Sequence, residues 1–95
     1  MDISRCTFCQ VIHREVKAQV IMETPEVIVI EDKSPRAPVH LLIIPRIHIP
    51  SVNEVDETLT HELGSLFLAA KEISKKYGLD SRGYKLLVNV GRGGG

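Results

Sequence analysis

The chain has 95 residues with few cysteines, no formal net charge and no long apolar run. Lys plus Arg equals Asp plus Glu at 12 each, so no long-range field attracts nucleic acid or an anionic membrane. No stretch reaches the roughly 18 apolar residues of a membrane span, and the first residues lack the apolar run of a signal peptide. We therefore expect a cytoplasmic protein that binds neither nucleic acid nor a membrane.

The two cysteines, Cys6 and Cys9, are too few for a disulfide framework, and no internal repeat is present. In a reducing compartment the C-x-x-C spacing indicates metal or redox chemistry. The length predicts a single domain over residues 1–95 with a modest core, near the size at which small domains fold alone. Oligomerisation or a bound metal would add stability.

Three apolar segments in the first half predict strands. Residues 20–23 and 27–30 are rich in β-branched side chains, and Pro25 between them favours a turn, so the two segments form a hairpin. Residues 39–44 follow a loop that contains two prolines, and they form an almost wholly apolar run that ends at Pro45. This pattern predicts a third strand that is buried on both faces.

A long helix is predicted over residues 56–77, which end in two lysines before Gly78. Its apolar positions recur at helical spacing: Leu59, Leu63, Leu66, Phe67, Ala70, Ile73 and Tyr77. Residues 11–16 are compatible with a short helix, and residues 84–90 predict a fourth strand. The order of these elements predicts an α+β fold, with an antiparallel sheet and one long helix packed on it.

The last seven residues, from Asn89 to Gly95, include four glycines. Glycine adopts positive φ readily and lets backbone N–H groups approach an anion closely. Such a loop joins two ordered segments or holds a phosphate, and the alternative is a flexible C-terminal tail.

The C-x-x-C pair supplies two of the four ligands that a structural zinc needs. His13 and His48 are candidates for a third ligand, and spacing alone does not choose between them. A thioredoxin-like redox role is less well supported because no strand precedes Cys6. Inert thiols are the third interpretation.

Three polar residues have both a plain and a functional interpretation. His40 interrupts an apolar strand, so it is either a hydrogen-bonded core residue or part of a site. Asp32 suits an Asx turn and Asn89 suits a strand end, and both become site candidates only together with His40 and the glycines. His61 lies outside the apolar stripe of the long helix and is expected to be solvated.

In combination these features resemble the histidine triad (HIT) family. The matching motifs, in chain order, are Cys6-x-x-Cys9, Asp32-x-Ser34-Pro35-x-Ala37-Pro38-x-His40, Ile44-Pro45-x-x-His48, Gly83-Tyr84 and Asn89-x-Gly91-x-x-Gly94. The family's alternating histidines, His-φ-His-φ-His, lie on a strand just beyond this glycine loop. The sequence ends a few residues short of them, so we expect a HIT-like domain that is incomplete at its C-terminus, with an exposed sheet edge.

The resemblance implies a purine nucleotide-binding domain of the nucleoside-phosphoramidase or dinucleotide-polyphosphate hydrolase type. In such enzymes the middle histidine of the triad attacks the α-phosphorus and forms a covalent intermediate. The resemblance also implies a homodimer formed through the long helix and the last strand. Lys33 departs from the pattern, because many family members carry an apolar residue at this position.

The resemblance implies roles for individual residues. Asp32 would bind the ribose hydroxyls, Asn89 would donate toward the phosphate, and His40 would support the nucleophile. The residues implied for the base pocket are Phe8, Val11 and Ile30. Those implied for zinc are Cys6, Cys9 and His48, together with the first histidine of the triad. Two other classes stay open: a noncatalytic nucleotide-binding or sensor module, and a zinc-stabilised structural domain.

Overall fold

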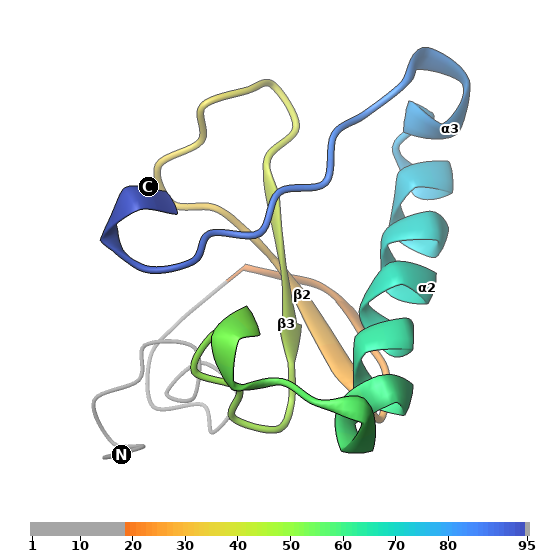
Figure 1. The fold of residues 1–95 in the computed structure, drawn as a ribbon. Helices are drawn as coiled ribbons and strands as arrows, with labels where there is room; N and C mark the ends of the chain where they lie inside the picture. The colour runs from red at the N-terminus through yellow and green to blue at the C-terminus, as the bar shows by residue number, and fades with distance from the viewer. Residues whose placement is uncertain (1–18, 95) are drawn as a thin grey trace. The chain divides into compact units, whose positions relative to one another are not determined.

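The structure is a computed structural model that describes residues 19–94, and the chain forms two compact units, residues 1–48 and 49–95 (Figure 1). The elements are β1 (Val20–Glu23), β2 (Val27–Glu31), β3 (Leu41–Pro45), η2 (Val52–Glu54), η3 (Glu57–Leu59), α2 (Thr60–Lys76), α3 (Leu79–Arg82) and η4 (Arg92–Gly94). A three-stranded antiparallel sheet and one long helix among these residues confirm the predicted α+β class. The short helix predicted at residues 11–16 lies outside the described residues. The single domain predicted over the whole chain stays a prediction.

The first unit contains the sheet, whose strand order is β1-β2-β3 with both pairs antiparallel. The predicted hairpin is therefore confirmed. Thr24 closes its turn, because the Thr24 N–H donates to the Val27 carbonyl at 2.8 Å and its hydroxyl oxygen accepts from the Val27 N–H at 3.0 Å. β1 thus ends directly before Thr24-Pro25-Glu26, and β2 begins directly after these three residues.

One face of this sheet carries a cluster of buried isoleucines. Ile28, Ile30 and Ile44 form the buried cluster, with Val20 and Leu42 packed against it. The register explains the cluster, since Ile28 pairs with Ile44 and Ile30 pairs with Leu42, and alternate residues of a strand share a face.

The strand that is buried on both faces is β2 rather than β3, so the prediction for the third strand was wrong in this respect. Residues Val27 to Ile30 are at most 5% exposed, whereas in β3 only Ile44 is buried and its neighbours are half-buried. β2 is the central strand and pairs on both sides, while β3 is an edge of the sheet that the described residues form. An apolar run in the sequence does not distinguish a central strand from an edge strand.

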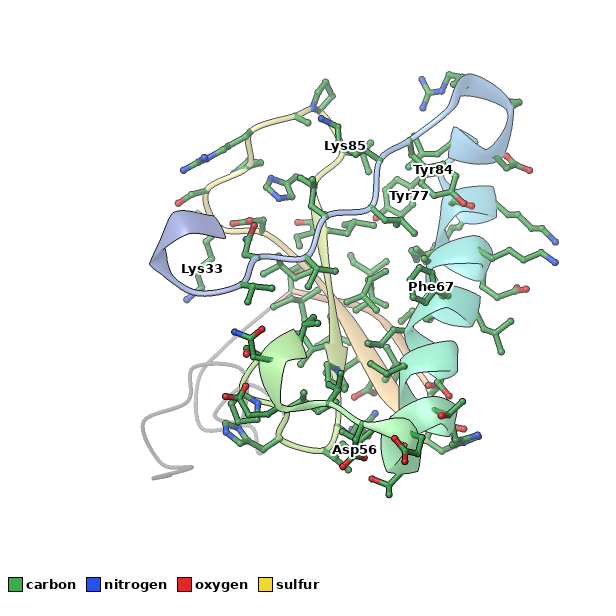
Figure 2. The ribbon with its side chains drawn as sticks, in the orientation of Figure 1. Lys33, Asp56, Phe67, Tyr77, Tyr84 and Lys85 are labelled. Atoms are coloured by element: carbon green, nitrogen blue, oxygen red, sulfur yellow. The ribbon has the colours of Figure 1, made fainter. Side chains whose placement is uncertain are left out.

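The second unit contains α2, which two short 3-10 turns precede. Each turn begins with a side-chain cap: the Ser51 hydroxyl oxygen accepts from the Asn53 N–H at 3.0 Å, and Asp56 Oδ1 accepts from the Thr58 N–H at 2.9 Å. Figure 2 shows Asp56 at the turn before α2. Two lysines lie in the last turn of the helix, and Gly78 follows with φ +69°, as the sequence predicts.

The buried face of α2 differs in part from the predicted stripe. Ala70 and Ile73 are buried as expected, but Phe67 is 63% exposed and its placement in the stripe was wrong. Ser74 is buried and was missed, because a serine does not register as apolar. Its hydroxyl donates to the Lys71 carbonyl at 2.8 Å, which satisfies the buried polar group.

The fourth strand predicted over residues 84–90 is not a strand in the structure. The short helix α3 comes first, and residues 83–90 then form no β-ladder with another described segment. Tyr84 and Lys85 lie on this segment (Figure 2), and its apolar residues Leu87 and Val88 are 74% and 67% exposed. The residue pattern favours a strand, but a strand exists only where a neighbouring backbone pairs with it.

No helix among residues 19–94 combines the length and apolar character that crossing a membrane requires.

We predict that the Asp56 cap makes stability depend on pH. The Thr58 hydroxyl, and after it the Thr58 backbone N–H, lower the pKa of Asp56 from its usual value. A carboxylate with a lowered pKa in the folded state stabilises the fold above the unfolded pKa of about 3.9, and this contribution is lost as pH falls through the folded pKa. Asp56→Asn should therefore lower the melting temperature at pH 7, and the difference from wild type should shrink in acid.

Thermal melts followed by circular dichroism at a series of pH values measure this difference. Glu57→Gln is the matched control, because it removes an exposed carboxylate from the adjacent position. A difference between wild type and Asp56→Asn that stays constant down to acid pH would contradict the prediction.

Candidate functional site

The loop between β2 and β3 brings together two of the predicted site residues. The last pair of the ladder is Glu31 with Leu41, so the next residues outward, Asp32 and His40, face each other at the base of the loop. The Asp32 N–H donates to the His40 carbonyl at 3.1 Å and closes the loop there. Asp32 and His40 are eight residues apart in the sequence, but they lie opposite each other because the two strands are antiparallel.

The Asp32 carboxylate is held on both sides by its own loop. Oδ1 accepts from the Ser34 N–H at 2.8 Å, which is the Asx turn that the plain interpretation predicts. Oδ2 lies 3.3 Å from Nε2 of His40. The side chain is 23% exposed, so a ligand can reach it. An ionised carboxylate has about four lone-pair sites, and these contacts leave roughly two of them open.

His40 is bound within the loop through both ring nitrogens. Nδ1 accepts from the Arg36 backbone N–H at 3.0 Å, while Nε2 faces the Asp32 carboxylate. Because Nδ1 is an acceptor, a neutral ring carries its proton on Nε2, which is the nitrogen that lies near the carboxylate. The side chain is 29% exposed, so His40 is not a core residue.

The rest of the loop, residues 33–38, is exposed. Lys33 lies on it directly after Asp32 (Figure 2). The Ser34 N–H is the partner that the Asx-turn interpretation of Asp32 predicts, since Asx turns bond two residues on. The Arg36 N–H was missed, and no sequence signal indicates it.

The predicted base-pocket and zinc residues are described only in part. Ile30 is 5% exposed within the buried cluster, and Phe8 and Val11 lie outside the described residues. His48 lies half-buried three residues after β3, while the alternative ligand His13 and both cysteines are not described. Within residues 19–94, no three His, Cys, Asp or Glu side chains gather as a metal site requires.

The glycine-rich segment forms a turn that folds back on Asn89. Gly91 has φ +64°, and the Gly94 N–H donates to the Gly91 carbonyl at 3.3 Å. A Cβ atom added at Gly94 would lie 3.2 Å from the carbonyl carbon of Asn89, so glycine permits this close approach. Asn89 itself is exposed.

The sequence matches the HIT domain model over residues 13–95. The chain belongs to the HIT domain family. The matched region contains Asp32, His40, His48 and Asn89, whereas Cys6 and Cys9 precede it.

Individual HIT proteins resemble the chain in sequence and in fold. Purine nucleoside phosphoramidase of Escherichia coli K12 is 38% identical over 88 residues, which cover 93% of this chain and 74% of the relative. The crystal structure of a HIT family hydrolase from Legionella pneumophila Philadelphia 1 has a TM-score of 0.93 at 37% identity, and the match covers 96% of this chain and 81% of that one. A histidine triad nucleotide-binding protein from Candida albicans has a TM-score of 0.72 at 26% identity, and the match covers 86% of this chain and 55% of that one. This HIT domain is therefore related to nucleotide hydrolases and to nucleotide-binding HIT proteins.

Proposed function

We propose that this HIT domain binds a purine nucleotide or nucleotide conjugate and serves hydrolysis or transfer at its α-phosphate. The observation that carries the proposal is the Asp32 carboxylate, held at the base of the β2–β3 loop and still partly exposed. The name of the Escherichia coli relative, a purine nucleoside phosphoramidase, supports the same class of ligand. A cytoplasmic location is part of the proposal, and cell fractionation tests it.

The Asp32 site suits the 2′ and 3′ hydroxyl groups of a ribose. A ribose presents two adjacent O–H donors, and an ionised carboxylate is purely an acceptor. Roughly two of its lone-pair sites stay open after the contacts with Ser34 and His40. Because those contacts already hold the carboxylate, binding costs less side-chain entropy than it would at a freely rotating aspartate.

We assign the phosphate to Asn89 and the glycine turn. The amide of Asn89 can donate to a phosphate oxygen, and glycines in a tight turn allow backbone N–H groups to approach an anion. This local recognition agrees with a chain of zero formal net charge, because no extended basic surface is needed. Ile30, together with Phe8 and Val11, is proposed to line the pocket for the purine base.

The HIT resemblance implies that the nucleophile that attacks the phosphorus is a histidine after the glycine loop. The printed 95 residues contain no histidine after His61. Within the described residues, the proposed function rests on Asp32 as the ribose acceptor.

The proposal predicts that Asp32 governs nucleotide affinity through the ribose. Asp32→Asn keeps an oxygen for the Ser34 N–H but removes the charge, so it should weaken AMP binding by about 1–3 kcal/mol, and Asp32→Ala by at least as much. Isothermal titration calorimetry with AMP and with 2′,3′-dideoxy-AMP measures the effect. Wild type should prefer AMP, and both variants should lose that preference.

Glu31→Gln is the control, because it removes the same charge from the exposed neighbouring position. Affinities for AMP that are equal in wild type and Asp32→Asn would overturn the ribose assignment. GMP, CMP and UMP titrated in parallel test the preference for a purine.

We also propose a structural zinc ion held by Cys6, Cys9 and His48. Thiolate and imidazole are the ligands that zinc prefers in structural sites. His48 supplies an imidazole three residues after the end of β3. Elemental analysis should find about one zinc per chain, and a chelator should lower the melting temperature because metal binding couples to folding.

Cys6→Ser and His48→Asn should each reduce the zinc content. His13→Asn tests the other candidate, and His61→Asn, at an exposed position of α2, is the control. If His48→Asn keeps its full zinc content and His13→Asn loses zinc, the third ligand is His13 and not His48.

Dimerisation is a further part of the proposal, supported by apolar side chains that the second unit leaves exposed. They are Phe67 at 63%, Leu68 at 65%, Leu86 at 49%, Leu87 at 74% and Val88 at 67% exposure. Exposed apolar groups of this kind mark interaction surfaces. Light scattering after size exclusion should give twice the 10.6 kDa of one chain.

Phe67→Ser should shift the equilibrium toward the monomer. Val52→Ser, which changes a 48% exposed apolar residue on η2, should leave the mass unchanged and is the matched control. A monomeric mass for wild type at all concentrations tested would refute the dimer.

A further inference from the structure

The base of the β2–β3 loop is fastened by four contacts among residues 32–40. Two are made by backbone N–H groups to side chains, from Ser34 to Asp32 at 2.8 Å and from Arg36 to His40 at 3.0 Å. One joins the backbones of Asp32 and His40 at 3.1 Å. The last joins their side chains, with Nε2 at 3.3 Å from Oδ2. In this arrangement His40 bridges the Arg36 backbone and the Asp32 carboxylate.

We propose that His40 is a positioning residue for Asp32, which holds the carboxylate in the orientation that accepts the ribose hydroxyls. This inference rests on the proposed nucleotide-binding function and adds a residue to its mechanism of recognition. It differs from the role that the HIT resemblance implies for His40, which is to support the nucleophile. The geometry connects His40 to ribose recognition within its own loop.

The occupancy of both ring nitrogens is the first reason. Nδ1 accepts from the Arg36 N–H, so the ring orientation is set from one side, and on the other side Nε2 carries the proton of a neutral ring and lies 3.3 Å from Oδ2. If both ring nitrogens carried a proton, the Nδ1–H group of His40 would point at the backbone N–H group of Arg36. The arrangement therefore fits one tautomer of a neutral imidazole, and this tautomer is the one that meets the carboxylate with a donor.

The two-sided hold on Asp32 is the second reason. A carboxylate that is bonded only at Oδ1 could still rotate about its terminal torsion, which is broad and roughly two-fold. The His40 contact at Oδ2 restricts that rotation and keeps the remaining lone pairs directed outward. Restricting a side chain in its bound orientation before the ligand arrives raises affinity, because the ordering cost is already met.

A purely structural role explains the pair less well. The side chains of His40 and Asp32 are 29% and 23% exposed, and a polar side-chain contact that solvent can reach contributes little to folding stability. The backbone bond between Asp32 and His40 already closes the loop without either side chain. Removing the imidazole should therefore change ribose recognition more than it changes stability.

Two substitutions separate the functions of the two nitrogens. The amide oxygen of His40→Asn can replace Nδ1 as the acceptor for Arg36, but the side chain is too short to reach Asp32. The longer side chain of His40→Gln can present an amide N–H to Asp32, but it has its amide carbon near the place of Nδ1, and this carbon cannot accept from the Arg36 N–H. The quantity to compare is the preference for AMP over 2′,3′-dideoxy-AMP, as a ratio of dissociation constants from calorimetry.

We expect His40→Asn to lower this ratio about tenfold and His40→Gln to keep it within about threefold of wild type. The affinity for 2′,3′-dideoxy-AMP should stay the same in both, because this nucleotide lacks the hydroxyl groups that Asp32 accepts. In an Asp32→Asn background, His40→Asn should cause no further change in the ratio. His61→Asn is the control for a histidine substitution at an exposed position.

The outcomes distinguish this inference from the proposed function. A wild-type chain that binds both nucleotides equally would refute the proposed ribose site itself. A normal wild-type ratio that is lost in Asp32→Asn but retained in His40→Asn would overturn only the role of His40. A ratio that falls further when His40→Asn is added to Asp32→Asn would also overturn it, since His40 would then act by another route.

Discussion

The antiparallel pairing of β2 with β3 is the constraint on which the site and the core of the first unit depend. Its register places Ile28 beside Ile44 on the buried face and continues to Glu31 beside Leu41. One step further, the same register sets Asp32 against His40. The register that brings Ile28 and Ile44 together in the buried cluster therefore also positions the site.

The sequence predicts those parts of the fold in which local pattern and tertiary pairing agree. Pro25 between two β-branched runs predicts the hairpin, and helical spacing before Gly78 predicts α2. It fails where the outcome depends on neighbours: Phe67 has helical spacing but is exposed, and residues 84–90 favour a strand but have no pairing partner among the described residues. Propensity describes what a segment can become, while its neighbours decide what it does become.

The candidate site shows the same division. The motif from Asp32 to His40 identifies both side chains and the Asx turn at Asp32, but it does not show that the two side chains meet or that Arg36 holds His40. Arg36 acts through its backbone N–H group, which every residue except proline possesses, so residue identity carries little information about it. Cys6, Cys9, Phe8 and Val11 remain predictions from the HIT resemblance, because they lie outside the described residues.

The backbone contacts in the β2–β3 loop set a rule for which sequences it can accept. The loop contains two prolines, Pro35 and Pro38, and neither stands where an N–H is used. Proline at position 34 or 36 would remove the donor to Asp32 or to His40, whereas other side chains at these positions would leave both donors in place. The exposed side chains of the loop are therefore free to vary in charge and size around a fixed carboxylate. The proposed ribose site can therefore keep its carboxylate in place while the side chains around it change.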